Sequence, residues 1–229
     1  MPIFHREEVP IEAVKKHLHK QGIEIRSNSL NLYIAIPFHF AIPERISCSK
    51  TSYIIYRTFI MILAVDVHYQ KEAAIVGGVL FRGWHDAKPL KELVISCSIT
   101  DNYIPGQFYR RELPCIAALL QQVSESLECI VIDGFVYLGR TREPGLGKHL
   151  RDMLDQKVVV IGVAKTPFRD TPKSCEVLRG NSRNPLYVTA DGMKEDRARF
   201  LIKNMHGKNR VPTLLKYVDR LCKADVSHY

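Results

Sequence analysis

Three acidic residues are the strongest candidates for chemistry in this sequence, and two of them interrupt or end apolar runs. Asp66 interrupts an apolar run (Leu-Ala-Val-Asp-Val), Asp133 ends another (Cys-Ile-Val-Ile-Asp), and Glu112 falls in the first turn of an expected helix. Because burying a lone carboxylate is costly, such residues are usually paired or bound to a cation. Carboxylates that converge in one cleft form the oxygen-rich site at which Mg²⁺ supports phosphodiester hydrolysis. The three acids therefore predict a divalent metal site, provided that the fold brings them together.

Each acid also has a simpler explanation when it is taken alone. Asp66 could face water at a strand edge, Asp133 could serve as a turn or N-cap residue before Gly134, and Glu112 could be favoured only by the helix dipole. Because all three acids are expected to converge in one fold, the metal hypothesis is favoured over these alternatives. Three carboxylates that crowd together without a cation would raise one another's pKa values.

The elements that would carry these acids follow from the hydrophobic pattern after residue 60. Apolar runs predict two strands over 61–69 and 73–81, joined by a tight turn, and a third antiparallel strand over 91–100. Apolar residues at helical spacing then predict a core-facing helix over 111–127. Asp66 would lie in the first strand, and Glu112 would lie at the start of the helix.

The second half of the sequence alternates between strands and helices. Wholly apolar runs at 129–133 and 157–163 are typical of buried parallel strands, joined here by a crossover helix at 147–154. A last strand is expected at 186–189, and helical sequence follows over 194–223. Antiparallel strands followed by parallel strands predict an α/β fold of the ribonuclease H-like type, with a mixed sheet flanked by helices.

The first 60 residues are patterned less clearly. Residues 10–22 predict a short amphipathic helix with Pro at its start and Gly at its end, whereas 23–60 contain no motif. We therefore expect an N-terminal segment, 1–60, and one domain that carries the acids, 61–225. A length of 229 residues suits a single hydrophobic core with an appended segment.

Composition narrows the class of protein. The 33 Lys and Arg exceed the 24 Asp and Glu, and the resulting charge of +9 favours a polyanionic partner such as nucleic acid, although a basic surface can serve solubility alone. The six cysteines form no C-x-x-C pair, so buried, reduced thiols are expected instead of a zinc ribbon. No apolar stretch reaches the about 20 residues of a membrane span. The N-terminus lacks a signal-peptide pattern, and we expect a cytoplasmic monomer.

Read together, several segments resemble the endonuclease V family in their order and spacing, from about residue 62 to residue 221. They are Val65-Asp66-Val67, Tyr103-Ile104-Pro105-Gly106 followed by Arg111-Glu112, Val131-Ile132-Asp133-Gly134, Ile161-Gly162-Val163-Ala164-Lys165, Asn184-Pro185-Leu186, and Arg210-Val211-Pro212 with Asp219. The resemblance implies a Mg²⁺-dependent endonuclease, with Mn²⁺ as a substitute, that acts in nucleic-acid repair. Its substrate would be DNA or RNA containing a deaminated base, inosine, and it would cut on the 3′ side of that base.

The resemblance also implies roles for single residues. Asp66, Glu112 and Asp133 would form the metal-binding core, and Asp219 would complete or flank it. Lys165 would place a point charge near the scissile phosphate, whereas its simpler explanation is a surface lysine at a strand end.

Other segments would contact the nucleic acid. The loop Tyr103-Ile104-Pro105-Gly106 would act as a wedge that fills the gap left by the deaminated base, and a plain Pro-Gly turn is the alternative. Gly134 and the stretch from Gly145 to Gly147 could line a pocket for the flipped base. Basic and polar residues expected at the strand, or else on a merely solvated face, are Arg140, Arg142, Lys148, His149, Arg169, Lys173, Arg179 and Arg183.

The sequence departs from the family pattern after Asp133-Gly134. The family continues with Gly and then His-Pro-Arg, whereas this chain reads Phe-Val-Tyr-Leu-Gly-Arg up to Arg140, so the histidine expected near position 139 is absent. An alternative hypothesis is therefore a nucleic-acid-binding homologue with reduced or lost catalysis. A third is a nuclease of the same fold that acts on another nucleic-acid structure.

Overall fold

The computed structural model describes residues 44–48, 51–55, 61–70, 73–98, 109–154 and 158–224. The chain forms two compact units, Met1–Phe59 and Ile60–Tyr229. In the first unit, the strands β1 (Glu44–Cys48) and β2 (Thr51–Ile55) pair as an antiparallel hairpin. The helix predicted over 10–22 lies outside the described residues. Among the helices of the described part, none combines the length and apolar character that crossing a membrane requires.

The second unit is built on a seven-stranded sheet with the strand order β10-β11-β9-β6-β3-β4-β5. Its strands are β3 (Met61–Tyr69), β4 (Ala73–Phe81), β5 (Lys91–Ser98), β6 (Leu127–Ile132), β9 (Val159–Ala164), β10 (Glu176–Val177) and β11 (Leu186–Asp191). β3, β4 and β5 are antiparallel, β3, β6 and β9 are parallel, and β11 is antiparallel to both β9 and β10. The predicted ribonuclease H-like mixed sheet is therefore confirmed.

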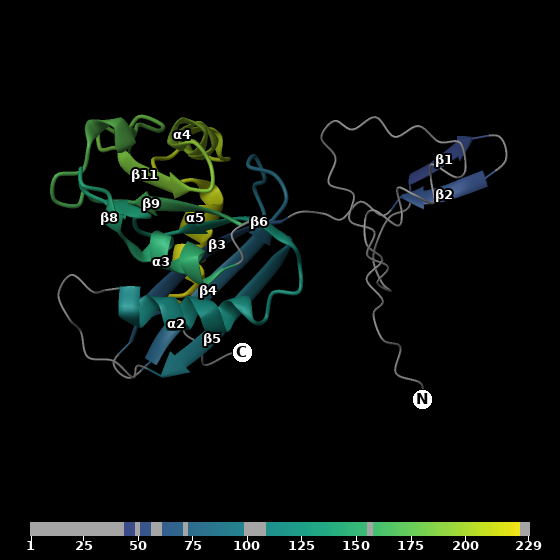
Figure 1. The fold of residues 1–229 in the computed structure, drawn as a ribbon, viewed down its shortest axis with the longest axis horizontal. Helices are drawn as coiled ribbons and strands as arrows, with labels where there is room; N and C mark the ends of the chain where they lie inside the picture. Colours follow the sequence, from purple (N-terminus) through teal and green to yellow (C-terminus); the bar gives the residue numbers. More distant parts are fainter. Residues whose placement is uncertain are drawn as a thin grey trace. The chain divides into compact units, whose positions relative to one another are not determined.

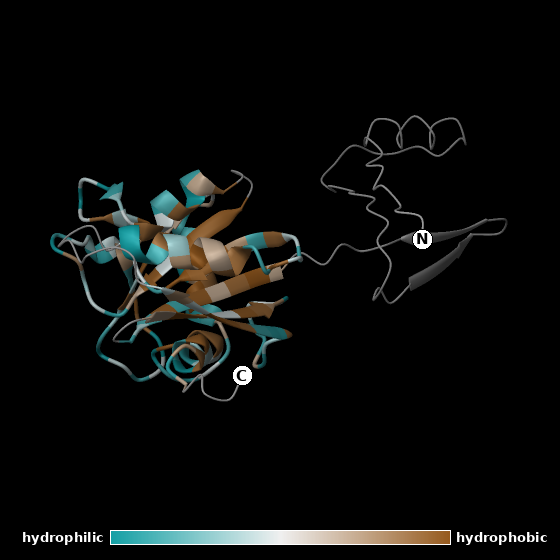
Figure 2. Cartoon of the chain, turned by 90° about the horizontal axis from the view of Figure 1, so that it is seen from below, coloured by the Kyte–Doolittle hydropathy of each residue, from teal (hydrophilic) through white to brown (hydrophobic). Residues whose placement is uncertain are grey.

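Helices cover both faces of this sheet (Figure 1). α2 (Tyr109–Leu120) and α3 (Leu146–Met153) pack on one face, and α4 (Glu195–Asn204) and α5 (Thr213–Leu221) pack on the other. Each face has its own apolar cluster, and Figure 2 shows apolar residues concentrated in the strands, while polar ones lie on the outer helix surfaces. A small hairpin, β7 (Tyr137–Leu138) and β8 (Glu143–Pro144), links β6 to α3.

Several element boundaries differ from the predictions, most of them by one or two residues. The largest difference is in the helix predicted over 111–127, which ends at Leu120, while Leu127 already begins β6, so the prediction was wrong after Leu120. Val123 and Leu127 still pack against the cluster beneath α2, which explains why their spacing imitated a helix. The strand predicted at 186–189 extends to Asp191, and the edge strand β10 was not predicted.

Candidate metal centre

Asp66 lies in β3 on the sheet face that α4 and α5 cover. Alternate residues of a strand point to opposite faces, and Ile62 and Ala64, which share the parity of Asp66, belong to the apolar cluster beneath α4 and α5. Gly77 stands opposite Asp66 on β4. A Cβ at Gly77 would lie 3.2 Å from the backbone nitrogen of Cys222, so this glycine lets the end of α5 approach the sheet beside Asp66.

The same parity places Asp133 and Lys165 on that face. Asp133 follows β6, the parallel neighbour of β3, and Lys165 follows β9, the next parallel strand. Val131 and Val163, two residues before them, belong to the cluster beneath α4 and α5. Both side chains therefore emerge at the carboxyl ends of adjacent parallel strands, which is where ligands bind in open α/β sheets.

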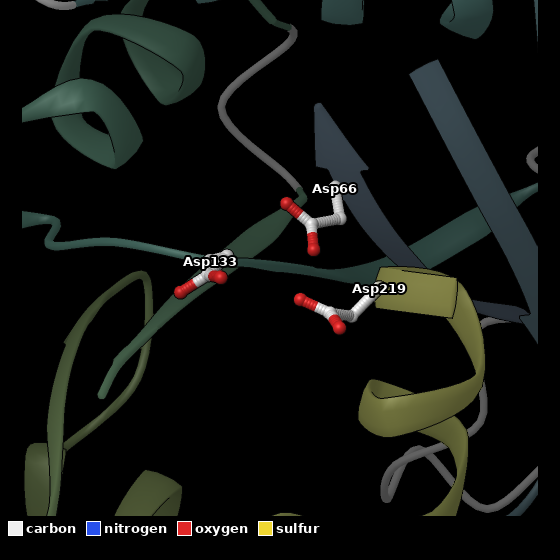
Figure 3. Close-up of side chains that lie close together, drawn as sticks. All are labelled: Asp66, Asp133 and Asp219. Atoms are coloured by element: carbon white, nitrogen blue, oxygen red, sulfur yellow. The ribbon is translucent and has the colours of Figure 1, made fainter. Parts of the chain in front are cut away.

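Asp219 on α5 completes a group of three carboxylates. One oxygen atom from each of Asp66, Asp133 and Asp219 lies within 4.8 Å of the others. Figure 3 shows the three side chains directed toward one another from β3, from the end of β6 and from α5. All three are partly buried, and Asp66 and Asp133 line a pocket whose apolar residues include Val163, Leu215 and Val218. Such a group could hold a metal ion, because oxygen atoms are the ligands that hard cations prefer.

Lys165 bridges two of these acids. Its Nζ donates to Oδ2 of Asp133 at 2.6 Å and to Oδ1 of Asp219 at 2.9 Å. Burial alone would lower the pKa of Lys165, but the two hydrogen bonds outweigh it and raise the pKa. Lys223 also donates to Oδ1 of Asp219, at 2.9 Å. Burial would raise the pKa of Asp219, yet its bonds to the two lysines hold that pKa below its ordinary value.

Asp66 is short of positive charge. Burial raises the pKa of Asp66 to about 7, repulsion from Asp133 adds to the rise, and the attraction of Lys165 only partly offsets it. A nearby positive charge favours the ionised form of a carboxyl, so a bound cation would stabilise Asp66 as a carboxylate. The oxygen donors and their uncompensated charge therefore fit a hard divalent cation.

Glu112 lies near this group but outside it. Its side chain is 6% exposed, and burial raises its pKa to about 9, with repulsion from Asp66 and then Asp133 contributing. Glu112 projects from α2, on the opposite side of the sheet from α5, whereas Asp66 and Asp133 belong to the face beneath α5. Glu112 is therefore coupled by charge to Asp66 and Asp133, whereas the group of three carboxylates within 4.8 Å of one another contains Asp219 and not Glu112.

The predicted nucleic-acid contacts are distributed around the domain. Lys148 forms an ion pair along the surface of α3, and the ring of His149 stacks on Tyr109 with centroids 3.8 Å apart. Arg140 is exposed in the turn between β7 and β8. The wedge loop, 103–106, lies outside the described residues. A strand contact for these residues stays a prediction.

Arg179 corrects one expectation. It was expected to hold a phosphate, but it is 5% exposed and all three of its guanidinium nitrogens donate to backbone carbonyls. The acceptors are Lys203 in the last turn of α4 and, in the segment that joins α4 to α5, Met205, Gly207, Asn209 and Arg210. Arg179 therefore organises this connection, because a buried guanidinium must have its donors satisfied.

The glycines expected around a base pocket have different surroundings. A Cβ at Gly145 would lie 2.6 Å from the carbonyl oxygen of Phe135, and a Cβ at Gly147 would lie 2.7 Å from Cγ2 of Val136. These two glycines are therefore packed against the segment after Asp133, where a side chain would not fit. Around Gly134, in contrast, no atom of the described residues beyond its chain neighbours lies within 4 Å of the Cβ position. A role for these glycines in a pocket for the flipped base stays a prediction.

Two residues beside the site were given no role by sequence reasoning. The buried Thr189 on β11 accepts a hydrogen bond at 2.8 Å from the backbone N–H of Val136, which tethers the segment after Asp133. No sequence signal announces this contact, because the two residues are 53 positions apart. Lys223, in contrast, stands four residues after Asp219, and that helical spacing of opposite charges could have indicated their pairing.

The fold and the site together define a ribonuclease H-like protein with an acidic centre that could hold a metal ion. Comparison with known proteins is more specific. The sequence profile of the endonuclease V family matches residues 46–191. The match begins within the predicted N-terminal segment, 1–60, and ends before α5 and Asp219. The chain belongs to the endonuclease V family, a family of endonucleases.

Individual relatives agree with this assignment. The chain is 28% identical over 165 residues to endonuclease V of Thermococcus kodakarensis, covering 72% of this chain and 78% of the relative. Endonuclease V of Pyrococcus horikoshii is 29% identical over 167 residues, covering 72% of this chain and 74% of the relative. Among solved structures, human ENDOV superposes with a TM-score of 0.58 at 18% identity, covering 73% of this chain and 84% of that one. Endonuclease V of Ciona intestinalis, in complex with a DNA containing an inosine followed by a ribo-adenosine, gives a TM-score of 0.59 at 18% identity, covering 72% and 84%.

Proposed function

We propose that this protein is a Mg²⁺-dependent endonuclease that cleaves a phosphodiester bond on the 3′ side of inosine in DNA or RNA, as a step in nucleic-acid repair. The observation that carries the proposal is the convergence of Asp66, Asp133 and Asp219 within 4.8 Å at the ends of the central strands. The substrate follows from family membership and is supported by the inosine-containing DNA bound to the Ciona intestinalis relative.

Asp66, Asp133 and Asp219 are proposed to hold the cation, with Glu112 as a further ligand from the α2 side. The oxygen-only donor set favours Mg²⁺, and Mn²⁺ is the expected substitute. When bound, the cation would activate a water molecule and stabilise the charge that develops on the leaving oxygen. The raised pKa values of Asp66 and Glu112 support this role, since the attraction of Lys165 for Asp66 and of Arg111 for Glu112 does not outweigh burial and the repulsion from neighbouring acids.

Lys165 is proposed to bind the scissile phosphate. Its ammonium already lies between Asp133 and Asp219, and its side chain is 37% exposed, so it can reach a phosphate oxygen beside the acids. An ammonium in this place opposes the negative charge that accumulates during phosphoryl transfer. Tyr103, Ile104, Pro105 and Gly106 remain the proposed wedge, and Arg140, Lys148 and His149 the proposed contacts of the strand.

The position of the missing histidine is held by a turn glycine. Gly139 lies between β7 and β8 with φ of +60°, a conformation that a side chain seldom adopts. If cleavage depended on a histidine at this position, it would be lost, and the protein would act as a nucleic-acid-binding homologue. The acidic group itself is complete, so we favour the active enzyme.

A cleavage assay tests the proposal directly. Single-stranded and duplex oligonucleotides of DNA and RNA, with one inosine or with adenosine in its place, would be incubated with Mg²⁺ or with chelator. Wild-type protein should nick only the inosine strands and only with Mg²⁺. Asp66→Asn should lower the rate by at least about 100-fold, as loss of one group that stabilises developing charge usually does. Asp152→Asn, which removes an exposed carboxyl on α3, is the matched control.

The outcomes separate the hypotheses. Salt-sensitive binding of the strands without any metal-dependent nicking would support the binding homologue and contradict the enzyme. Nicking of adenosine and inosine strands at equal rates would contradict the substrate but not the nuclease. If Asp66→Asn cuts as fast as Asp152→Asn, the acidic group is not the active site.

A further inference from the structure

A second pocket adjoins the acidic group on the side of α5. It has a volume of about 290 Å³ and is lined by Lys165, Asn209, Arg210, Val211, Lys216 and Asp219. Its wall carries three cationic side chains and one carboxylate, and that carboxylate is already bonded to Lys165 and Lys223. The pocket therefore has an excess of positive charge and attracts an anion.

Hydrogen bonds from two arginines hold the backbone that forms the wall of the pocket. The guanidinium of Arg210 donates to the carbonyl oxygens of Lys165 and Pro185, the latter at 2.7 Å, which ties the pocket to the end of β9. Arg179 donates from its Nη1 to the carbonyl oxygens of Asn209 at 2.9 Å and Arg210 at 3.2 Å. Because the backbone on this side is held by a buried arginine, the cations of the pocket keep a defined geometry before any ligand binds.

Two of the cationic groups retain unused donors. Nε of Arg210 is buried and has no hydrogen-bond partner among the described residues. Lys216, one helical turn before Asp219 on α5, is exposed, and within the described part of the chain its ammonium makes no ion pair. Lys216 therefore does not serve the packing of α5, which turns Leu214 and Val218 toward the core instead.

We propose that this pocket binds the backbone phosphate of a nucleotide adjacent to the scissile bond, with Lys216 as its principal contact and Arg210 supplying fixed charge. The inference rests on the proposed nuclease function, because Lys165 and Asp219 are shared between the pocket and the acidic group. Binding there places a neighbouring phosphate beside the three acids and thereby sets the register of the strand over them. Phosphate contacts of this kind position a nucleic acid without reading its sequence.

Binding measurements without cleavage test the proposal. Fluorescence anisotropy in chelator would give the Kd of wild type, Lys216→Ala and Lys194→Ala for an inosine-containing single strand. Lys194 is an exposed lysine that does not line the pocket, so it is the matched control. We expect Lys216→Ala alone to weaken binding several-fold and to reduce the slope of log K against log salt by about 0.7, the value for one phosphate contact with a single strand.

A methylphosphonate scan identifies the phosphate. Each phosphate in turn is replaced by an uncharged methylphosphonate, and one position next to the scissile bond should weaken binding to wild type and to Lys194→Ala, but not to Lys216→Ala. Equal losses in all three proteins at every position would overturn the proposal. A second result would also overturn it: millimolar inorganic phosphate competes with the strand in wild type but not in Lys216→Ala, while no methylphosphonate position changes the Kd. The pocket would then bind a free anion only.

These outcomes are independent of the cleavage assay. If wild type nicks inosine strands and Lys216→Ala binds like Lys194→Ala, the pocket proposal fails while the proposed function stands. If no strand is cut but the scan reveals one position that depends on Lys216, the pocket binds a strand phosphate and the nuclease hypothesis fails. Thermal unfolding of both variants would confirm that neither has lost its fold.

Discussion

The ammonium of Lys165 lies 2.6 Å from Oδ2 of Asp133, at the carboxyl ends of two adjacent parallel strands. This pair gives the acidic group its one shared positive charge, because the same ammonium also reaches Asp219 at 2.9 Å. This positive charge does not balance the carboxylates, since burial and repulsion from Asp133 keep the pKa of Asp66 raised to about 7 despite Lys165. Four consequences of this arrangement and of the segments around it can be measured.

Lys165→Gln should reduce both activity and metal-free stability. Without its ammonium, only Lys223, at Asp219, opposes the repulsion among the three carboxylates. The loss of unfolding free energy in chelator should be about 1 kcal/mol, because Lys165 and Asp133 are both partly solvated. Saturating Mg²⁺ should stabilise the variant more than wild type, since the cation then relieves a larger repulsion. Urea unfolding with and without Mg²⁺ measures this. The idea fails if Mg²⁺ stabilises Lys165→Gln and the control Lys194→Gln equally.

Metal-free stability should fall as pH rises from about 4.5 to about 9. Burial raises the native pKa of Glu112 to about 9 and that of Asp66 to about 7, so in this window the native state holds protons that the unfolded chain has released. Glu112→Gln keeps a neutral side chain at all pH values and should flatten the decline. At pH 8 its melting temperature in chelator should exceed that of wild type by at least about 2 to 4 °C, the equivalent of about 1 kcal/mol in a domain of this size.

A pH series of thermal unfolding in chelator, for wild type, Glu112→Gln and the exposed control Glu128→Gln, checks this expectation. The difference between the profiles isolates Glu112 from other titrating groups. If the melting temperatures of wild type and Glu112→Gln change in parallel with pH, ionisation of Glu112 does not destabilise the native state, and the prediction is wrong.

Gly162→Ala should destabilise the segment that carries Asp133. A Cβ at position 162 would lie 2.6 Å from the carbonyl oxygen of Gly134 and 2.8 Å from the backbone nitrogen of Val136. Because these neighbours are backbone atoms, they must shift, at a cost of about 1 to 3 kcal/mol for an overpacked site. The cleavage rate should also fall, since Asp133 directly precedes Gly134.

Gly83→Ala is the comparison for this variant, because the three atoms nearest to the new Cβ all belong to the side chain of Asp86. Denaturant midpoints of the two variants give the difference in stability. If Gly162→Ala and Gly83→Ala unfold at the same denaturant concentration, the segment after Asp133 accommodates the new Cβ without a loss of stability.

Arg179→Met should be more damaging than any substitution of an exposed arginine. It removes the Arg179 donor from five backbone carbonyls, one at the end of α4 and four between α4 and α5, in a place that is almost closed to water. We expect a loss of about 2 to 4 kcal/mol of unfolding free energy. Arg183→Met, which changes an exposed residue, should cost less than about 0.5 kcal/mol. Urea unfolding of both variants decides whether Arg179 is structural, and similar midpoints would argue that it is not.

The sequence alone determined the strands and the residues most suited to chemistry. Runs of apolar residues marked β3 and β4 with their observed bounds, and the acids that interrupt or end such runs marked Asp66 and Asp133. Both signals are local, because a strand has a period of two residues and a charge within an apolar run is conspicuous wherever the run lies. The order of antiparallel and parallel strands also followed from local patterns and connection lengths.

Only the tertiary structure decided which side chains meet. It grouped Asp219, and not Glu112, with Asp66 and Asp133, because α5 covers the face to which those two acids belong while α2 covers the other. It turned Arg179 from an expected phosphate ligand into a buried anchor, and it packed Gly145 and Gly147 against Phe135 and Val136. These facts depend on distances between segments far apart in the chain, which no periodicity in a single segment encodes.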